Sequence, residues 1–145
     1  MAGAALLAAT LGPSAATVVM AAILFVQALV FQDGGVLALG ANVLNLAVVG
    51  VWVAYLPLRW SRKAGARSRR AAAFLGAWMS LMAVAVLASA ELSFSKVAPP
   101  VSLFTSLLAI HALLGIAEGL ITTASLAAME RLNPAFVYAG ERSGR

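Results

Sequence analysis

The chemistry open to this chain rests on a few polar side chains within long apolar runs. Gln27, Asn42, Asn45 and Glu118 are each flanked by apolar residues. A polar group at membrane depth is costly unless it hydrogen-bonds to a neighbouring helix or lines a path for a ligand, ion or proton. Both interpretations stay open for each residue. The sequence therefore predicts four path-lining candidates, which are Gln27, Asn42, Asn45 and Glu118.

Other kinds of chemistry are excluded by residues that the chain lacks. There is no cysteine, which removes disulfides and thiolate metal sites. His111 is the only histidine, and one imidazole does not make a zinc site. No nucleophile lies in a pattern with a base, and no carboxylates are paired in a catalytic arrangement. We expect no enzymatic activity, no cofactor bound by this chain and no metal site within it.

Composition places the protein in lipid. Of its 145 residues, 63% are hydrophobic and only 10% are charged, and the mean hydropathy is +0.98. A soluble domain carries about a quarter charged residues, and one of this size cannot hide so much apolar surface. The net charge of +5 does not indicate nucleic acid, because six of the ten basic residues lie between positions 59 and 70, between two apolar runs.

The apolar runs predict an all-α fold, a polytopic transmembrane helix bundle with about four spans. A span needs about 20 residues, and the runs that satisfy this are 13–31, 39–58, 71–90 and 101–129. The stretch before Gly12 is too short to cross, so we expect a short N-terminal apolar stub that is interfacial or half inserted. A polar tail follows at 130–145. We expect residues 1–145 to form a single transmembrane domain, with a loop containing Glu91 and Lys96 between the last two spans.

The distribution of Lys and Arg predicts the orientation. If the N-terminus is cytoplasmic, the 59–70 loop and the tail are cytoplasmic too, which places nine of the ten basic residues inside and only Lys96 outside. We therefore expect cytoplasmic N- and C-termini, with Asp33 and Lys96 on the outer side.

The last span carries a polar stripe at helical spacing. Residues at steps of three and four share one helix face, and here they are His111, Gly115, Glu118, Thr122, Ser125 and Met129. We expect this face to meet protein or a water-filled cavity. Small residues let helices approach closely, so Gly115 and Gly119 here, and Ala72 and Gly76 in the third span, are predicted packing positions.

Two motifs resemble one known family. Residues 25–50 resemble a run that joins two transmembrane helices in the CbiM/NikM substrate-binding membrane components of energy-coupling factor transporters, through Gln-Ala-Leu at 27–29, Gly-Gly at 34–35, Leu-Gly-Ala-Asn at 39–42 and Val-Gly at 49–50. Residues 118–122, Glu-Gly-Leu-Ile-Thr, are similar to that family's last helix. The resemblance covers the chain from Gly12 to about Leu132.

The resemblance implies a subunit of the bacterial cytoplasmic (inner) membrane that takes up cobalt or nickel as a transported substrate. It implies a transmembrane coupling subunit and ATPase subunits as partners. In that family the metal is held by the N-terminal amine and by histidines at the second position and in an early loop, whereas this chain has Ala2 and no histidine before His111. The chain is thus similar to the C-terminal portion of the family, and we expect a truncated or split member with a separate N-terminal half. The alternative is a small membrane interaction or accessory subunit without a transport substrate of its own.

Overall fold

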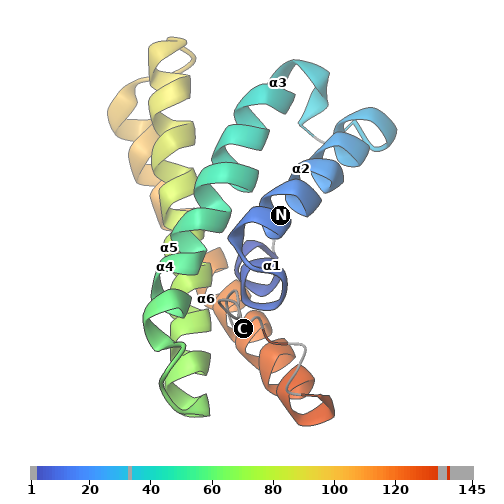
Figure 1. Ribbon diagram of the computed structural model, residues 1–145. Helices are drawn as coiled ribbons and strands as arrows, with labels where there is room; N and C mark the ends of the chain where they lie inside the picture. Colours follow the sequence, from blue (N-terminus) through green and yellow to red (C-terminus); the bar gives the residue numbers. More distant parts are fainter. Residues whose placement is uncertain (1–2, 33, 134–136, 138–145) are drawn as a thin grey trace.

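A computed structural model of the chain describes residues 3–32, 34–133 and 137. The described part consists of helices and short connections (Figure 1). In chain order the elements are α1 (Ala4–Leu11), α2 (Pro13–Val30), α3 (Gly35–Asn42), η1 (Val43–Gly50), α4 (Val51–Ser61), α5 (Ala66–Phe94) and α6 (Pro100–Leu132). The prediction of an all-α helical bundle is confirmed.

Four helical segments are long and apolar enough to cross a membrane within the described residues: Pro13–Val30, Gly35–Ser61, Ala66–Phe94 and Pro100–Leu132. They correspond to the four predicted spans but extend beyond them at most ends. An apolar stretch marks only the hydrocarbon part of a helix, and the backbone hydrogen bonds continue into the headgroup region. For this reason Glu91 lies in α5 and not in the predicted loop, and Glu130 lies in the last turn of α6 and not in the predicted tail.

The second span is a continuous rod with an irregular centre. Helices α3 and α4 are joined through η1, a π-helix of eight residues, without an intervening loop. Pi-helical segments are rare and usually occupy a single turn. Gly50 closes this segment, and a Cβ there would lie 3.2 Å from Ser80 Oγ of α5. The wider turns of η1 therefore pack closely against α5.

The N-terminal stub is buried within the bundle. Ala5, Ala8 and Ala9 of α1 are almost inaccessible, and α1 packs on α4, α5 and α6 as well as on α2. The interfacial alternative for this stub is therefore wrong. The buried side chains of α1 are all alanines, so this face fits between helices that bulkier side chains would push apart.

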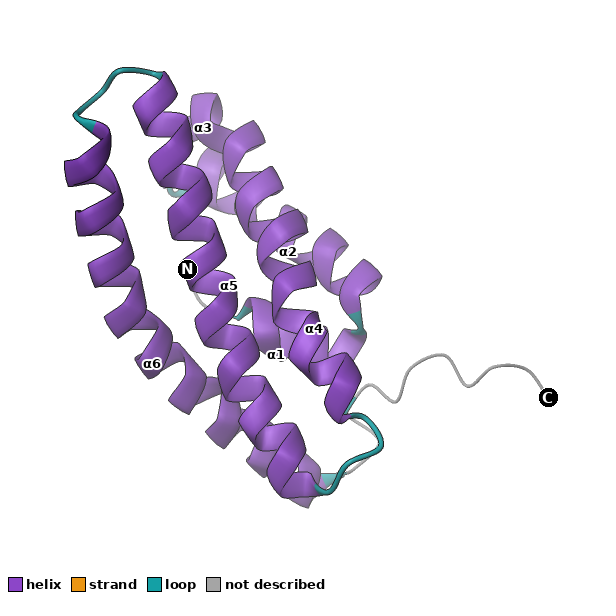
Figure 2. Cartoon of the chain, turned by 90° about the vertical axis from the view of Figure 1, so that its left-hand side faces the viewer, coloured by secondary structure: helices purple, strands orange, loops and turns teal. Residues whose placement is uncertain are grey.

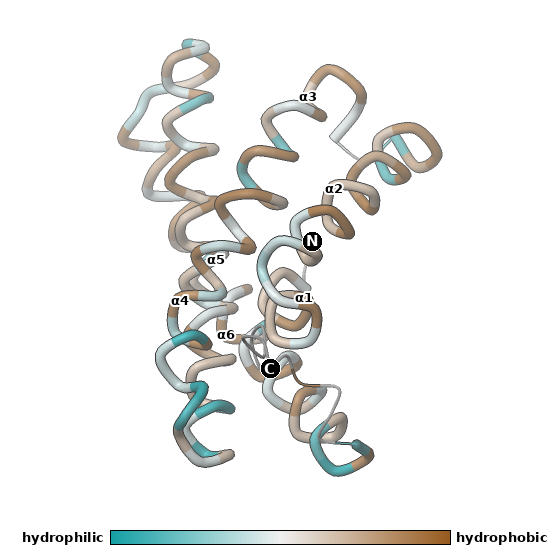
Figure 3. Tube along the Cα trace, in the orientation of Figure 1, coloured by the Kyte–Doolittle hydropathy of each residue, from teal (hydrophilic) through white to brown (hydrophobic). Residues whose placement is uncertain are grey.

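Helices α5 and α6 pair along most of their lengths, as Figure 2 shows. The outer surfaces of the helices are rich in large exposed apolar side chains such as Leu113, Leu120 and Ile121. Hydrophilic segments gather at the ends of the rods, most clearly where α4 meets α5 and at the end of α6 (Figure 3). This is the distribution expected of helices surrounded by lipid, whose backbone polar groups are satisfied within each helix.

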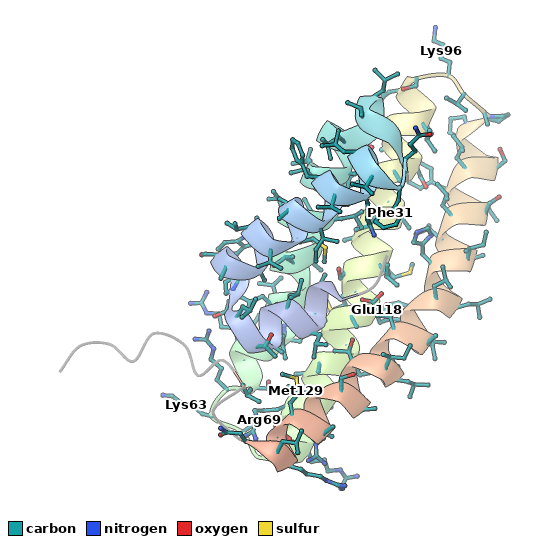
Figure 4. All side chains as sticks on the ribbon, turned by 90° about the vertical axis from the view of Figure 1, so that its right-hand side faces the viewer. Phe31, Lys63, Arg69, Lys96, Glu118 and Met129 are labelled. Carbon is teal, nitrogen blue, oxygen red and sulfur yellow. The ribbon has the colours of Figure 1, made fainter. Side chains whose placement is uncertain are left out.

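Basic residues lie at both ends of the bundle. Lys96 lies at one end, Lys63 and Arg69 lie at the other, and Glu118 lies between them (Figure 4).

Helix α6 ends at Leu132, and Asn133 is extended with φ −160°, because the proline that follows disfavours the helical conformation. Of the predicted tail after Asn133, only Val137 is among the described residues, and Asp33 lies outside them.

Candidate substrate path

A cavity of about 360 Å³ lies between the second span and α5, on the Lys96 side of the bundle. We call it the Asn45 pocket. Its polar lining residues are Asn42, Asn45, Glu91 and Ser95, and the others are Ala38, Ala41, Leu46, Val84, Ala88 and Leu92. Two of the four predicted candidates, Asn42 and Asn45, therefore line one cavity.

Asn45 is the polar centre of this pocket. Its side-chain amide donates to both carboxylate oxygens of Glu91, with Nδ2 lying 3.0 Å from Oε1 and 2.9 Å from Oε2. Asn45 is only 4% exposed. Its Oδ1 is buried and has no hydrogen-bond partner among the described residues. Buried polar atoms are nearly always paired, so this oxygen is an exception within the fold.

The side chain of Asn42 lies beside Gly34, in the connection between α2 and α3. Gly34, at the start of α3, has φ +74°, and a Cβ at this position would overlap Nδ2 of Asn42. Gly34 is therefore required both for its backbone conformation and for the space that Asn42 occupies. Gln27 is half-buried in α2, and the described residues provide no hydrogen bond between its side chain and either asparagine. Gln27 is not among the described residues that line the Asn45 pocket.

Glu118 is buried in the middle of the bundle, where it is 7% exposed. Its Oε1 accepts a hydrogen bond of 2.8 Å from the backbone N–H of Gly3, just before α1. The carboxylate thus holds the start of the N-terminal segment at mid-depth (Figure 4). His111 lies two turns away along α6, where its Nδ1 is 2.8 Å from the carbonyl oxygen of Leu107. The imidazole bonds to its own helix, and no direct contact couples it to Glu118.

The polar stripe of α6 faces protein at its centre. Gly115, Glu118 and Thr122 are buried, whereas His111, Ser125 and Met129 are half-buried. A Cβ on Gly115 would lie 2.8 Å from the indole ring of Trp78, and one on Gly119 would lie 2.6 Å from the ring of Phe74. The indole Nε1 of Trp78 also donates to the carbonyl oxygen of Ala112 over 3.2 Å. The two glycines therefore accommodate mainly aromatic rings from α5.

The small residues of α5 meet the second span. Ala72 and Gly76 are buried, and a Cβ on Gly76 would overlap the backbone carbonyl of Ala54 in α4. This contact brings two backbones together, which is the packing mode proposed for small residues in membrane helices.

The opposite end of the bundle carries an ion-pair cluster. Oε1 of Glu130 accepts from Nε and Nη2 of Arg69 at 3.1 and 2.9 Å, and its Oε2 accepts from Nε and Nη2 of Arg70 at 3.2 and 3.1 Å. Forked guanidinium–carboxylate bonds are geometrically specific. One carboxylate thereby joins the end of α6 to the beginning of α5, on the Lys63 side of the molecule.

One residue of these clusters, Glu91, was not among the predicted site residues. Glu91 continues the face of α5 formed by Ser80, Val84 and Ala88, at steps of three and four, so extending the helical period past Ala90 finds it. Its pairing with Asn45 has no sequence signal, because the two residues are 46 positions apart. Among residues 3–32, 34–133 and 137, no three His, Cys, Asp or Glu side chains converge on a point that suits a metal ion.

Four spanning helices with buried amides and carboxylates between them define a multi-pass helical membrane protein. The chain belongs to the CbiM family, described as the cobalt uptake substrate-specific transmembrane region, whose model matches residues 1–136. The family resemblance expected from residues 25–50 and 118–122 is thereby confirmed.

Known proteins support this assignment. A putative fused nickel transport protein NikMN of Archaeoglobus fulgidus is 36% identical over 98% of this chain and 56% of its own length. The cobalt transport protein CbiM of Anoxybacillus flavithermus is 39% identical over 77% of this chain and 47% of its own length. The chain thus spans about half the length of these relatives. They are transport proteins, in agreement with the prediction that the chain is not an enzyme.

A solved structure gives the same result for the fold. The crystal structure of a truncated transition metal transporter superimposes with a TM-score of 0.72 at 31% sequence identity. The match covers 90% of this chain and 67% of the other.

Proposed function

We propose that this chain is a membrane component of a cobalt or nickel uptake transporter of the energy-coupling factor type. The observation that carries the proposal is the family match over residues 1–136, which includes every buried polar group described above. A transmembrane coupling subunit and ATPase subunits would supply the energy. The membrane is the bacterial cytoplasmic membrane, with both chain termini on the cytoplasmic side, as the clustering of basic residues favours.

The polar groups suit a path from the outer side inward. The Asn45 pocket lies on the Lys96 side, and Glu118 lies at mid-depth between Lys96 and Arg69 (Figure 4). Broken or irregular helices at membrane depth are tolerated where they face protein or a polar cavity, and η1 borders such a cavity. In this proposal Asn42, Asn45 and Glu91 form the outer part of the path and Glu118 forms its centre.

High-affinity ligands for the metal are proposed to come from a separate N-terminal half. Cobalt and nickel ions favour nitrogen ligands, imidazole above all. The one imidazole of this chain bonds to Leu107 of its own helix, and the side chains of the Asn45 pocket offer oxygen and amide groups. The fused relatives NikMN and LarMN show that family members occur joined to further segments. The chain alone is therefore expected to bind cobalt and nickel only weakly.

Uptake of radioactive cobalt and nickel tests the proposal. The chain is expressed with the coupling and ATPase subunits encoded beside it, and with any adjacent N-terminal segment, in cells that lack their own cobalt and nickel uptake. Uptake above background that is lost when this chain is omitted supports the proposal, provided that the other subunits stay in the membrane. Uptake that is unchanged without this chain would contradict it and favour an accessory subunit.

A further inference from the structure

We infer that the Asn45 pocket is a low-affinity site for a hydrated divalent cation, with Asn45 Oδ1 and the Glu91 carboxylate as its protein ligands. The inference rests on the proposed function and deepens it, because it names the groups that meet the ion first. The sequence predicts that Glu91 lies in a loop, whereas in the structure it lies in α5 against Asn45.

The first support is the unpaired oxygen. Asn45 is 96% buried, being 4% exposed, and its Oδ1 lacks a partner among the described residues while Nδ2 is fully engaged with Glu91. An amide oxygen has two lone pairs. Oδ1 is itself enclosed in this conformation, so it can coordinate a cation in the cavity only after the amide turns.

The second support is the charge of the pocket. Glu91 is its only charged lining residue among those described, since Asn42, Asn45 and Ser95 are neutral and the other lining side chains are apolar. A single negative charge between low-dielectric walls concentrates cations locally. No guanidinium or ammonium group of the described lining competes for the carboxylate, in contrast to Glu130, which binds two arginines.

The third support is the volume of the pocket. The pocket volume is about 360 Å³. Six waters around an octahedral ion occupy roughly 180 Å³, at about 30 Å³ for each water. The pocket can therefore hold an ion that keeps most of its hydration shell, with one or two waters replaced by protein oxygens.

Rotation of the Asn45 side-chain amide allows the pocket to change between an empty and an ion-bound state. In the structure its NH2 group is bonded to Glu91. The terminal torsion of asparagine is roughly two-fold, so a half-turn presents Oδ1 in place of Nδ2. The oxygen would then face a cation that the carboxylate also binds. The ion thus replaces the hydrogen bond that it breaks, and the side chains need not move apart.

A site in the outer part of a transport path must bind the ion weakly. A site on a transport path must attract the ion and also release it to the next site. Oxygen ligands suit magnesium, calcium and manganese, and they hold cobalt and nickel less firmly than nitrogen ligands do. We therefore expect binding of several divalent ions with little selectivity, and we assign selectivity to the nitrogen ligands of the proposed N-terminal half.

Manganese is a suitable probe, because the electron paramagnetic resonance signal of free Mn²⁺ is lost on binding. The purified untagged chain in lipid nanodiscs is titrated with Mn²⁺. We expect one site per chain with Kd on the order of 10⁻⁴ to 10⁻³ M, as in other weak oxygen-ligand sites, and displacement of Mn²⁺ by Co²⁺. Glu91→Gln keeps an oxygen acceptor for Asn45 but removes the charge, and it should weaken binding roughly tenfold or more, since affinity follows ligand charge. Asn45→Asp adds a second carboxylate and should strengthen binding.

The matched control is Glu130→Gln, which removes the same charge at the opposite end of the bundle and should leave Mn²⁺ affinity unchanged. Equal Mn²⁺ affinity in the wild-type and Glu91→Gln chains, with both folded by circular dichroism, would overturn the inference, as would absence of binding to the wild type. The uptake assay separates the two proposals. A Glu91-dependent site in a chain that is dispensable for uptake refutes the proposed function alone. Uptake that requires the chain, without a Glu91-dependent site, refutes the inference alone.

Discussion

The carboxylate of Glu118 accepts a hydrogen bond from the backbone N–H of Gly3, 115 positions earlier in the sequence. This bond joins the last helix to the beginning of the described chain at mid-depth in the bundle. Because an unpaired N–H in hydrocarbon is costly, Glu118 stabilises the inserted position of α1 as well as its own burial.

Substitutions at Glu118 test this role. Glu118→Gln keeps an oxygen acceptor for the Gly3 amide and should change stability little. Glu118→Leu leaves that amide without a partner and should cost about 1–3 kcal/mol. The measurement is reversible unfolding of the purified protein in mixed detergent, followed by circular dichroism. Equal stability of the Leu variant and the wild type would show that the bond contributes nothing.

The contact between Gly76 and Ala54 predicts intolerance to a single methyl group. Gly76→Ala places its Cβ against a backbone carbonyl, which cannot rotate away, so α4 and α5 must separate at a cost of about 1–3 kcal/mol. Gly40→Ala is the matched control, because Gly40 lies in α3 with open space around its Cβ position. That change should be neutral or stabilise by about 0.5–1 kcal/mol. The same unfolding assay compares both variants, and an equal effect of the two would refute the close-contact argument.

The ion pairs of Glu130 with Arg69 and Arg70 predict that electrostatic attraction stabilises the contact between α5 and α6. Glu130→Gln removes the ionic bonds to Arg69 and Arg70 and should lower stability by about 1–3 kcal/mol at low salt. Because both guanidinium groups are about one-third exposed, salt should screen part of this difference. Thermal unfolding of both proteins at low and high salt checks the expectation. A stability difference between the two proteins that grows with salt would be inconsistent with stabilisation by ion pairs.

The predicted orientation can be tested cleanly because the chain has no native cysteine. Gly65→Cys and Lys96→Cys place single thiols at exposed positions at opposite ends of the bundle. With an impermeant maleimide on intact cells, Cys at position 96 should react, whereas Cys at position 65 should react only after the membrane is opened. The reverse labelling pattern would show that the chain has the opposite orientation in the membrane.

The sequence predicted the parts of this fold that depend on local composition. The four spans follow from apolar runs, and the burial of Gly115, Glu118 and Thr122 follows the helical period of α6. The burial of α1 was not predictable from its length and composition, because only contacts with α4, α5 and α6 decide between an interfacial and an interior position. The Asn45–Glu91 bond was missed for a related reason: Glu91 lies where apolar residues give way to polar ones, and hydropathy alone ends the span before it.

The π-helix from Val43 to Gly50 also constrains how the chain tolerates insertions and deletions. Each residue of an α-helix advances the side-chain direction by about 100°. If the eight residues of η1 formed an ordinary α-helix instead, α3 would be rotated relative to α4, because a π-helical turn holds more residues than an α-helical turn. Asn42 would then leave the wall that it shares with Glu91, although no residue of that wall had been replaced. In this segment the number of residues is as important as their identity, because together with the π-helical winding it sets the direction of α3 relative to α4.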